Sequence, residues 1–344
     1  MDFLGFFIIC VKVLLVFAGT LLAVLIMVYA ERRVSAFMQG RLGPNRVGPQ
    51  GLLQPIADGI KFLMKEDIIP DGVNKPIYLL APVIMLIPAL MTFAVIPFGS
   101  TITLFDRDII LQVADVNIGI LYILALTSIG VYGIVLAGWA SNSKYTLIGG
   151  LRSSAQLISY ELALGLSAVS IILMSGSLRL NDIVADQQGY LLSWYVFKQP
   201  LAFLIFLIAT YAETNRLPFD LAEAEQELVG GYHTEYSSMK FAMFFMSEYA
   251  NMITAAALTV TLFFGGWDVP LLDEKSLGIW GAMLSVASFI LKMGFFLFLF
   301  IWIRWTFPRF RYDQLMKLGW KVLLPLSLIN IFITGGYLTL AALK

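Results

Sequence analysis

The chain has 344 residues, of which 59% are hydrophobic and only 13% are charged, and its mean hydropathy is +0.83. Soluble globular domains carry roughly 25% charged residues, so this composition excludes a soluble protein and predicts an integral membrane protein. The formal net charge is zero, which argues against a nucleic-acid partner.

Apolar runs of roughly 20 residues, the length that crosses about 30 Å of hydrocarbon as a helix, occur eight times. We place them at residues 3–30, 77–98, 118–140, 154–174, 201–212, 241–264, 278–303 and 321–343. The fifth is short. The alternating segments of about ten residues that mark a membrane β-barrel are absent. The sequence therefore predicts an all-α polytopic protein with a single membrane domain over residues 1–344.

Positive charge is distributed unevenly between the two sides of the predicted membrane domain. Lys12 and Lys292 lie inside spans. The other Lys and Arg residues lie in or at the border of the loops at about 31–76, 141–153, 213–240 and 304–320, except for Arg107, Arg179, Lys198, Lys275 and Lys344. Short cytoplasmic loops accumulate Lys and Arg. We therefore expect the odd-numbered loops to face the cytoplasm and both termini to lie on the outer face.

The chain contains one cysteine, Cys10, and one histidine, His233. Fe–S clusters need several thiolates, haem needs axial ligands, and zinc needs about four nitrogen or sulfur donors. Neither a phosphate-binding Gly-rich motif nor a G-x-S-x-G motif is present. We expect no metal or redox centre on this chain, and a function that depends on carboxylates, arginines and a cavity.

The first cytoplasmic loop begins with a stretch rich in Gly and Pro, residues 41–51, which favours tight turns. From Leu52 onward, apolar residues recur at helical spacing, while Gln54, Asp58, Lys61 and Lys65 form a polar stripe. This pattern predicts an amphipathic helix at the membrane surface. A simple interfacial anchor is an equally good interpretation of the pattern alone, but Asp58 argues against it because anchors prefer basic residues.

The fifth loop concentrates acidic residues beside the membrane. Its six carboxylates are Glu213, Asp220, Glu223, Glu225, Glu227 and Glu235. We expect a turn at Pro218 and then a short helix that ends at Gly230, with Asp220, Glu223 and Glu227 on one face. The loop is compatible with a solvated acidic surface. Acids that crowd beside a low-dielectric region can also hold protons and pass them on.

Ionisable residues inside the spans are costly and usually line an interior path. Glu161, Glu248 and Lys292 lie at stepped depths, and Glu213 ends the fifth span. Together they predict a proton path that is entered from the cytoplasmic side. For each acid the alternative is a structural hydrogen bond between helices, and Lys12 is placed to extend toward the outer surface.

Four long motifs together carry a resemblance to a known family. They are ERR…RLGPNRVGPQGLLQPIADGIKFLMKED, SNSKYTLIGGLRSSAQLISYE, ETNRLPFDLAEAEQELVGGYHTEYSSMKFAMFFMSEY and RWTFPRFRYDQLMKLGWK. The chain resembles the H-subunit family of bacterial respiratory complex I, the NADH:quinone oxidoreductase, over essentially its whole length. Subunits of membrane-bound hydrogenases and chloroplast-type dehydrogenases share parts of these motifs, whereas the full GPNRVGPQGLLQPIADG and AEAEQELV runs are closer to the respiratory enzyme.

The resemblance implies a subunit of the bacterial plasma (inner) membrane that forms the membrane-facing part of a quinone tunnel and has quinone as a substrate. The residues implied to line or flank the quinone chamber are Glu31, Arg32, Asp58, Lys61, Arg216, Glu223, Glu225 and Glu227. Those implied for the proton path are Glu161, Glu213, Asp220, Glu248 and Lys292. The resemblance places FMN, the Fe–S clusters and the groups that bind the quinone head on hydrophilic partner subunits, and it implies further partners in the membrane arm.

One feature departs from some relatives, because the predicted third span, 118–140, carries no acid. A carboxylate path must then jump or use water in that region.

Two other classes of function are alternatives to a coupling subunit. A proton-coupled transporter predicts an internal repeat with broken helices, and a structural anchor leaves Glu161 and Glu248 unexplained. The apolar tunnel walls suit ubiquinone and menaquinone equally.

Overall fold

The computed structural model describes residues 3–104, 107–220, 229–270, 272 and 277–343. The described chain is mostly helical, and seven helices are long and apolar enough to cross a membrane. They are α1 (Phe3–Met38), α3 (Lys75–Met91), α4 (Gly119–Ala140), α5 (Lys144–Ser175), α10 (Ser238–Phe263), α11 (Ile279–Thr306) and α13 (Leu324–Ala342). The last continues α12 (Tyr312–Lys317) through a π-helical turn at Leu318–Leu323. The predicted all-α membrane fold is confirmed.

The fifth predicted span forms α8 (Pro200–Glu213), which has 14 residues and is shorter than the other apolar helices. The surface helix predicted from Leu52 is present as α2 (Gln54–Met64). Its apolar residues Ile60, Leu63 and Met64 are exposed, as expected for an amphipathic helix.

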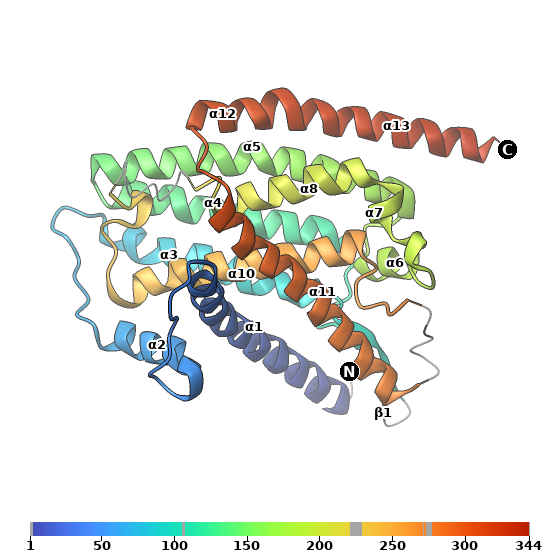
Figure 1. Ribbon diagram of the computed structural model, residues 1–344, viewed down its shortest axis with the longest axis horizontal. Coiled ribbons are helices and arrows are strands. Elements are labelled where there is room, and N and C mark those ends of the chain that lie inside the picture. Colours follow the sequence, from blue (N-terminus) through green and yellow to red (C-terminus); the bar gives the residue numbers. More distant parts are fainter. Residues whose placement is uncertain (1–2, 105–106, 221–228, 271, 273–276, 344) are drawn as a thin grey trace.

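Short elements that the hydropathy pattern does not predict lie at the opposite end of the molecule from α2, together with both termini (Figure 1). They are α6 (Leu180–Ala185), α7 (Tyr195–Lys198) and an antiparallel hairpin of β1 (Gly99–Leu104) and β2 (Arg107–Leu111). Lys12 donates hydrogen bonds to the carbonyl oxygens of Ile110 and Gln112, at 2.7 and 3.2 Å, which ties α1 to the hairpin. Lys12 thus reaches toward the end of α1 that bears the N-terminus.

Helix α10 is the most buried of the seven long helices. In its apolar 18-residue segment 72% of the residues are buried, compared with 11% for α1, so α10 lies at the centre of the bundle. Helices α3, α4 and α5 pack closely through glycines. A Cβ atom at Gly133 of α4 would lie 3.0 Å from the Ala81 oxygen of α3, and one at Gly138 would lie 2.7 Å from the Thr146 oxygen of α5. Small residues let apolar helices approach in this way, and this approach surrounds the polar groups described below.

Two helices extend further on the side of α2 than the predicted spans. Helix α1 continues to Met38, eight residues beyond the expected end, so Glu31 and Arg32 are helical rather than part of a loop. Charged residues do not end a helix, and the chain turns only at Gly40, where φ is +65°. Helix α5 begins at Lys144 instead of residue 154. Gly149, within this helix, packs closely against Gly231. A Cβ atom added at Gly149 would lie 2.8 Å from the Cα atom of Gly231.

Candidate functional site

A buried carboxylate near the end of α1 joins four segments of the chain. Glu31 forms ion pairs with Arg304 of α11 and with Arg216 of the loop after α8, the latter with 3.5 Å between Oε1 and Nη1. Tyr249 of α10 donates a hydrogen bond of 2.7 Å to Glu31 Oε2. The Arg216 guanidinium lies 4.4 Å from the centre of the Tyr249 ring. We call these four residues the Glu31 cluster.

The next residue of α1 points to a different side of the helix. Arg32 forms an ion pair with Asp58 of α2, whose side chain is 17% exposed. Lys61 Nζ lies 3.9 Å from Asp58 Oδ1, and Gln54 Nε2 donates a hydrogen bond of 3.3 Å to the same oxygen. The structure therefore brings three of the predicted quinone-site residues together, and it places them beside the Glu31 cluster along α1.

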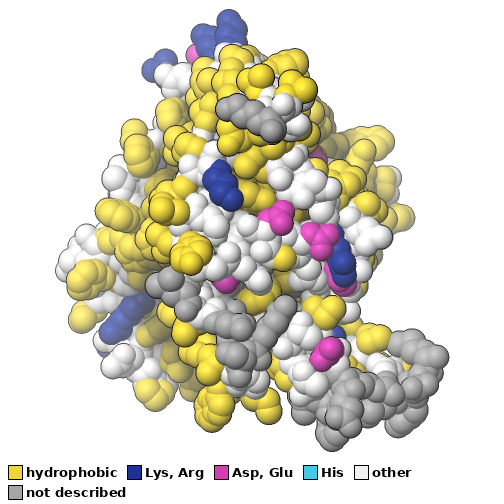
Figure 2. Space-filling view, turned by 90° about the vertical axis from the view of Figure 1, so that its right-hand side faces the viewer, with side chains coloured by type: hydrophobic (Ala, Val, Ile, Leu, Met, Phe, Trp, Pro, Cys, Tyr) yellow, Lys and Arg dark blue, Asp and Glu magenta, His cyan; other side chains and the backbone are white. Residues whose placement is uncertain are grey.

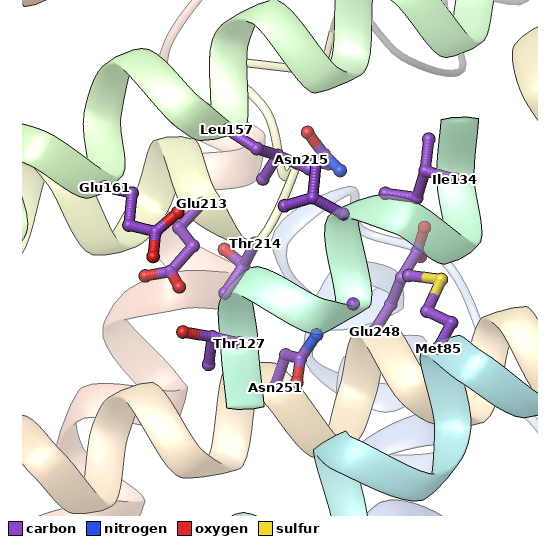
Figure 3. Close-up of a pocket in the computed structure, with 12 residues that line it drawn as sticks. Met85, Thr127, Ile134, Leu157, Glu161, Glu213, Thr214, Asn215, Glu248 and Asn251 are labelled. Atoms are coloured by element: carbon purple, nitrogen blue, oxygen red, sulfur yellow. The ribbon is translucent and has the colours of Figure 1, made fainter. Parts of the chain in front are cut away.

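Three acids of the predicted proton path line one cavity, which we call the acid pocket. Glu161 comes from α5, Glu213 from the end of α8 and Glu248 from α10. The carboxylates of Glu161 and Glu213 point toward each other, and Glu248 lies on the other side of α4 (Figure 3). The volume open to the centre of a water molecule is about 20 Å³, which is room for about one water.

Hydroxyl groups complete the acid pocket where acids are missing. Ser128 of α4 donates a hydrogen bond to Glu161, and Tyr232 donates one of 2.9 Å to Glu248. A second cavity of about 20 Å³ shares Thr127 and Glu213 with the acid pocket. Helix α4, which lacks an acid, thus supplies the hydroxyl groups of Ser128 and Thr127 to this region. Each cavity has room for about one water.

Asp220 of the fifth loop has a cationic partner outside that loop. Asp220 forms an ion pair of 2.9 Å with Arg309, which precedes α12, so this acid contacts the segment between α11 and α12. Glu223, Glu225 and Glu227 lie outside the described residues, as does the short helix predicted there.

Lys292 lies apart from the acid pocket, at the end of α10 that is opposite to α2. Its Nζ donates hydrogen bonds to the carbonyl oxygens of Phe264, Gly266 and Asp268 at 2.9, 3.1 and 2.7 Å. It also lies 4.5 Å from the centre of the Trp194 ring. These contacts tie Lys292 of α11 to the backbone of the loop that follows α10. The structure brings Glu161, Glu213 and Glu248 together, but it places Lys292 in a different environment.

Several residues of these sites give no clear signal in the sequence. In the sequence Arg304 directly follows a predicted span and looks like any cation of a loop. Its pairing with Glu31 is not visible there, although a buried carboxylate needs a cation beside it. Ser128, Tyr232 and Tyr249 lie in or next to apolar helices, where hydroxyl groups leave no mark on a hydropathy profile. Among the described residues, no group of three or more His, Cys, Asp or Glu side chains is placed to hold a metal ion.

Comparison with known proteins places the chain in a family. Residues 11–335 match the family model described as NADH dehydrogenase. The chain belongs to the NADH dehydrogenase family. It is 58% identical over 335 residues to the NADH-quinone oxidoreductase H-subunit 1 of Geobacter sulfurreducens, covering 94% of this chain and 93% of that protein.

Similar relatives occur in other bacteria. The chain is 54% identical to the NADH-quinone oxidoreductase H-subunit 2 of Koribacter versatilis, over 96% of both chains. It is 50% identical to the NADH-quinone oxidoreductase H-subunit of Flavobacterium johnsoniae, over 95% of this chain and 93% of that protein. The resemblance carried by the four sequence motifs is confirmed. The matches extend through α1, the acid pocket and α11, so membership applies to the whole membrane domain.

Proposed function

We propose that this chain is a membrane subunit of a proton-translocating NADH:quinone oxidoreductase that borders the quinone tunnel and links quinone reduction to proton movement. The observation that carries the proposal is the closeness of two polar sites along the chain. Glu213 lines the acid pocket, and Arg216, three residues later, contacts Glu31. The names of the relatives support this function over a transporter or a simple anchor.

Quinone enters sideways between α1 and its neighbouring helices, and its head moves past α2 toward the hydrophilic arm. The isoprenoid tail stays among apolar side chains. Met27, Met252 and Phe300 line a cavity of about 10 Å³ beside Glu31 and Arg304. This volume is far below that of a quinone head, so partner subunits complete the chamber in the assembled enzyme.

The reduced quinone head requires protons, and its reduction changes the charge next to Asp58 and the Glu31 cluster. Charges a few ångströms apart in a protein interact strongly enough to shift a carboxylate pKa by a unit or more. The changed charge of the quinone head acts on Arg216, which keeps its own charge. Its effect is transmitted from Arg216 to Glu213 and then to Glu161 and Glu248. Ser128, Thr127 and bound water offer the intermediate hydrogen bonds.

The electron carriers belong to the partners in this proposal. FMN and the Fe–S clusters lie on hydrophilic subunits that dock on the side of α2, and antiporter-like subunits extend the membrane arm. Quinone is a substrate of the assembled enzyme. The exposed apolar residues of α2 together with Phe37 and Leu42 offer a contact surface on that side.

The chain lies in the bacterial plasma membrane, with the end that bears α2 toward the cytoplasm and both termini on the outer face. The lysines and arginines gather toward the α2 end, as short cytoplasmic loops do. The opposite end, which holds both termini, carries fewer Lys and Arg side chains, and some of them lie beside acidic groups (Figure 2), as Arg179 does in its ion pair with Asp115.

Asp58→Asn in the native membrane complex tests the function. Asp58 accepts contacts from Arg32, Lys61 and Gln54, so loss of its charge should rearrange the entrance to the chamber. We expect NADH:quinone activity to fall about tenfold, as for the loss of one charged hydrogen-bonding partner. NADH:ferricyanide activity, which bypasses the quinone site, should stay unchanged.

Asp71→Asn serves as the matched control, because Asp71 is an exposed acid of the same loop. It should leave both activities intact. Unchanged quinone activity in Asp58→Asn, with normal assembly, would contradict the placement of this chain at the quinone site.

A further inference from the structure

One buried side chain holds both ends of the turn that separates the acid pocket from the Glu31 cluster. Gln156 of α5 is fully buried. Its Nε2 donates hydrogen bonds of 2.8 Å to the carbonyl oxygens of Ala212 and Phe219, and it lies 3.3 Å from Asn215 Oδ1. The three acceptors surround one NH₂ group, so a single amide fixes the start, the middle and the end of the segment 212–219.

The orientation of this amide follows from its neighbours. Two of the three contacts are backbone carbonyl oxygens, which only accept hydrogen bonds, so the nitrogen of Gln156 must face them. Gln156 Oε1 has no hydrogen-bond partner among the described residues. Its donors alone therefore determine how the amide lies.

The segment held by Gln156 carries one residue of each site. Glu213 is the last residue of α8 and lines the acid pocket, whereas Arg216 contacts Glu31. Between them Asn215 has φ of +50°, a left-handed conformation that Asn tolerates better than most residues. Its side chain also lies 3.4 Å from Ser153 Oγ of α5. The turn is thus anchored to α5 at both ends and at its middle residue.

The simpler interpretation is that Gln156 only caps α8. The Ala212 carbonyl is one of the last four of that helix and needs a donor. A cap alone does not explain the bond to the Phe219 carbonyl, which lies six residues beyond the helix end, or the contact with Asn215. Gln156 closes the turn into a loop whose two ends share one anchor.

We propose that Gln156 is a positioning residue that makes the 212–219 turn move as one unit, so that a displacement of Arg216 shifts Glu213 in the acid pocket. This inference rests on the proposed function and adds the route by which the two sites are coupled. Without Gln156, Arg216 responds to charge in the quinone chamber while Glu213 stays in place. Quinone reduction then continues with less proton translocation.

The test is Gln156→Met in the intact complex in native membranes. Methionine keeps the length and volume of the side chain and removes the donors. We expect normal assembly and normal NADH:ferricyanide activity, and the number of protons translocated per quinone reduced should fall at least about twofold. A net hydrogen bond shifts a conformational equilibrium by roughly fivefold, and this variant loses three contacts.

Gln187→Met is the matched control. Gln187 is also fully buried, and it donates hydrogen bonds of 3.1 Å to the carbonyl oxygens of Ile183 and Thr261, near the outer end of α10. It should leave the proton ratio unchanged, because it is not in contact with the 212–219 turn. A normal ratio in Gln156→Met, or an equal fall in both variants, would overturn the proposal and leave Gln156 as a helix cap.

A second variant decides the matter if Gln156→Met does not assemble. Asn215→Gly preserves the left-handed backbone and removes the Oδ1 acceptor and the contact with Ser153. A lowered proton ratio in Asn215→Gly supports the proposal, and an unchanged ratio contradicts it. The Asp58→Asn result separates this inference from the proposed function, since a failure confined to the proton ratio leaves the quinone assignment in place.

Discussion

Glu31 has a buried negative charge that Arg216 and Arg304 neutralise. Removing such groups from water costs several kcal/mol for each ion, and their mutual contacts must offset that cost. The side chain of Arg216 is 10% exposed and that of Arg304 is 32% exposed. Loss of the carboxylate should therefore cost more free energy at Arg216 than at Arg304, because water can still reach Arg304.

We expect Glu31→Gln to destabilise the junction of α1, α10 and α11 by about 3 kcal/mol, as for other broken buried ion pairs. Thermal inactivation of NADH:quinone activity, normalised to the activity before heating, should occur at a lower temperature. Asp313→Asn is the control, because it breaks an ion pair with Lys317 whose side chains are 64% and 66% exposed. Such pairs contribute below about 1 kcal/mol, and equal shifts in the two variants would refute the account.

At the residue scale, the sequence identifies charges inside apolar spans but not their partners. Glu161 and Glu248 stand out because a carboxylate in hydrocarbon is costly, and both line the acid pocket. Ser128 and Tyr232 are common residues in apolar helices, so their pairing with those acids appears only in three dimensions. Lys292 carries the same signal as the acids, yet it contacts the backbone of the loop after α10.

At the scale of elements, α2 is attached to the bundle near its middle and at its carboxyl end. Arg32 of α1 forms an ion pair with Asp58 in the middle of α2. At the carboxyl end, Ser238 Oγ lies 2.9 and 3.0 Å from the carbonyl oxygens of Phe62 and Lys65, and Lys240 Nζ lies 2.7 Å from Asp67 Oδ1. Helix α10 carries Glu248 as well, so the surface helix and the acid pocket share a support.

Lys240→Met should loosen α2 without altering Asp58 itself. The Lys240 side chain is 10% exposed and that of Asp67 is 53% exposed, so we expect a loss of about 1 kcal/mol and a roughly fivefold larger undocked population. The KM for quinone should rise, and hydrogen exchange in residues 54–68 should accelerate. Lys240→Arg, which keeps the charge, should restore both. Faster exchange with an unchanged KM would separate α2 docking from quinone access.

An ion pair whose strength depends on pH joins the segment between β2 and α4 to the start of α6. Arg179 Nε donates a hydrogen bond of 2.9 Å to Asp115, and this bond holds the pKa of the Asp115 carboxyl below its usual range. A carboxyl with a lower pKa in the folded chain stabilises the fold fully above its unfolded pKa of about 3.9. That contribution is lost as the pH falls through the folded pKa.

Asp115→Asn should therefore lower the thermal unfolding temperature at neutral pH and lose its effect as the pH falls through the lowered pKa of Asp115. The loss should stay below about 1 kcal/mol, since Arg179 is 39% exposed. Unfolding in detergent, followed by tryptophan fluorescence across this pH range, measures the difference. Asp108→Asn, at an exposed hairpin position, should have little effect. A difference that persists unchanged at low pH would exclude the ion pair as its cause.

Hydropathy predicted the existence of the long helices well and their ends less well. Helix α1 extends to Met38 because helical spacing tolerates charged residues, and α5 begins at Lys144 because its glycines pack against neighbouring segments. The hairpin at β1 and β2 is too short to stand out beside spans of about 20 residues. Its register depends on contacts with α11, such as the bond from Ser100 N to Ser285 Oγ.

At the scale of the whole molecule, α2 lies at one end and both termini lie toward the other (Figure 1). Most of the Lys and Arg residues belong to the loops on the side of α2, which we call the charged end. The Glu31 cluster lies toward the charged end, and the acid pocket lies inside the bundle around α10. A short turn from Glu213 to Arg216 connects the two. This arrangement can convert a charge change at one site into a proton shift at the other.

Glu213→Gln in the intact complex tests this account most directly, with Glu66→Gln, an exposed acid of the first loop, as the control. The account predicts that Glu213→Gln lowers coupled NADH:quinone activity and proton translocation about tenfold or more, because a glutamine side chain cannot hold and release the proton. NADH:ferricyanide activity should be unaffected, and Glu161→Gln should behave in the same way. Normal quinone turnover with normal proton translocation in both variants would contradict the central claim.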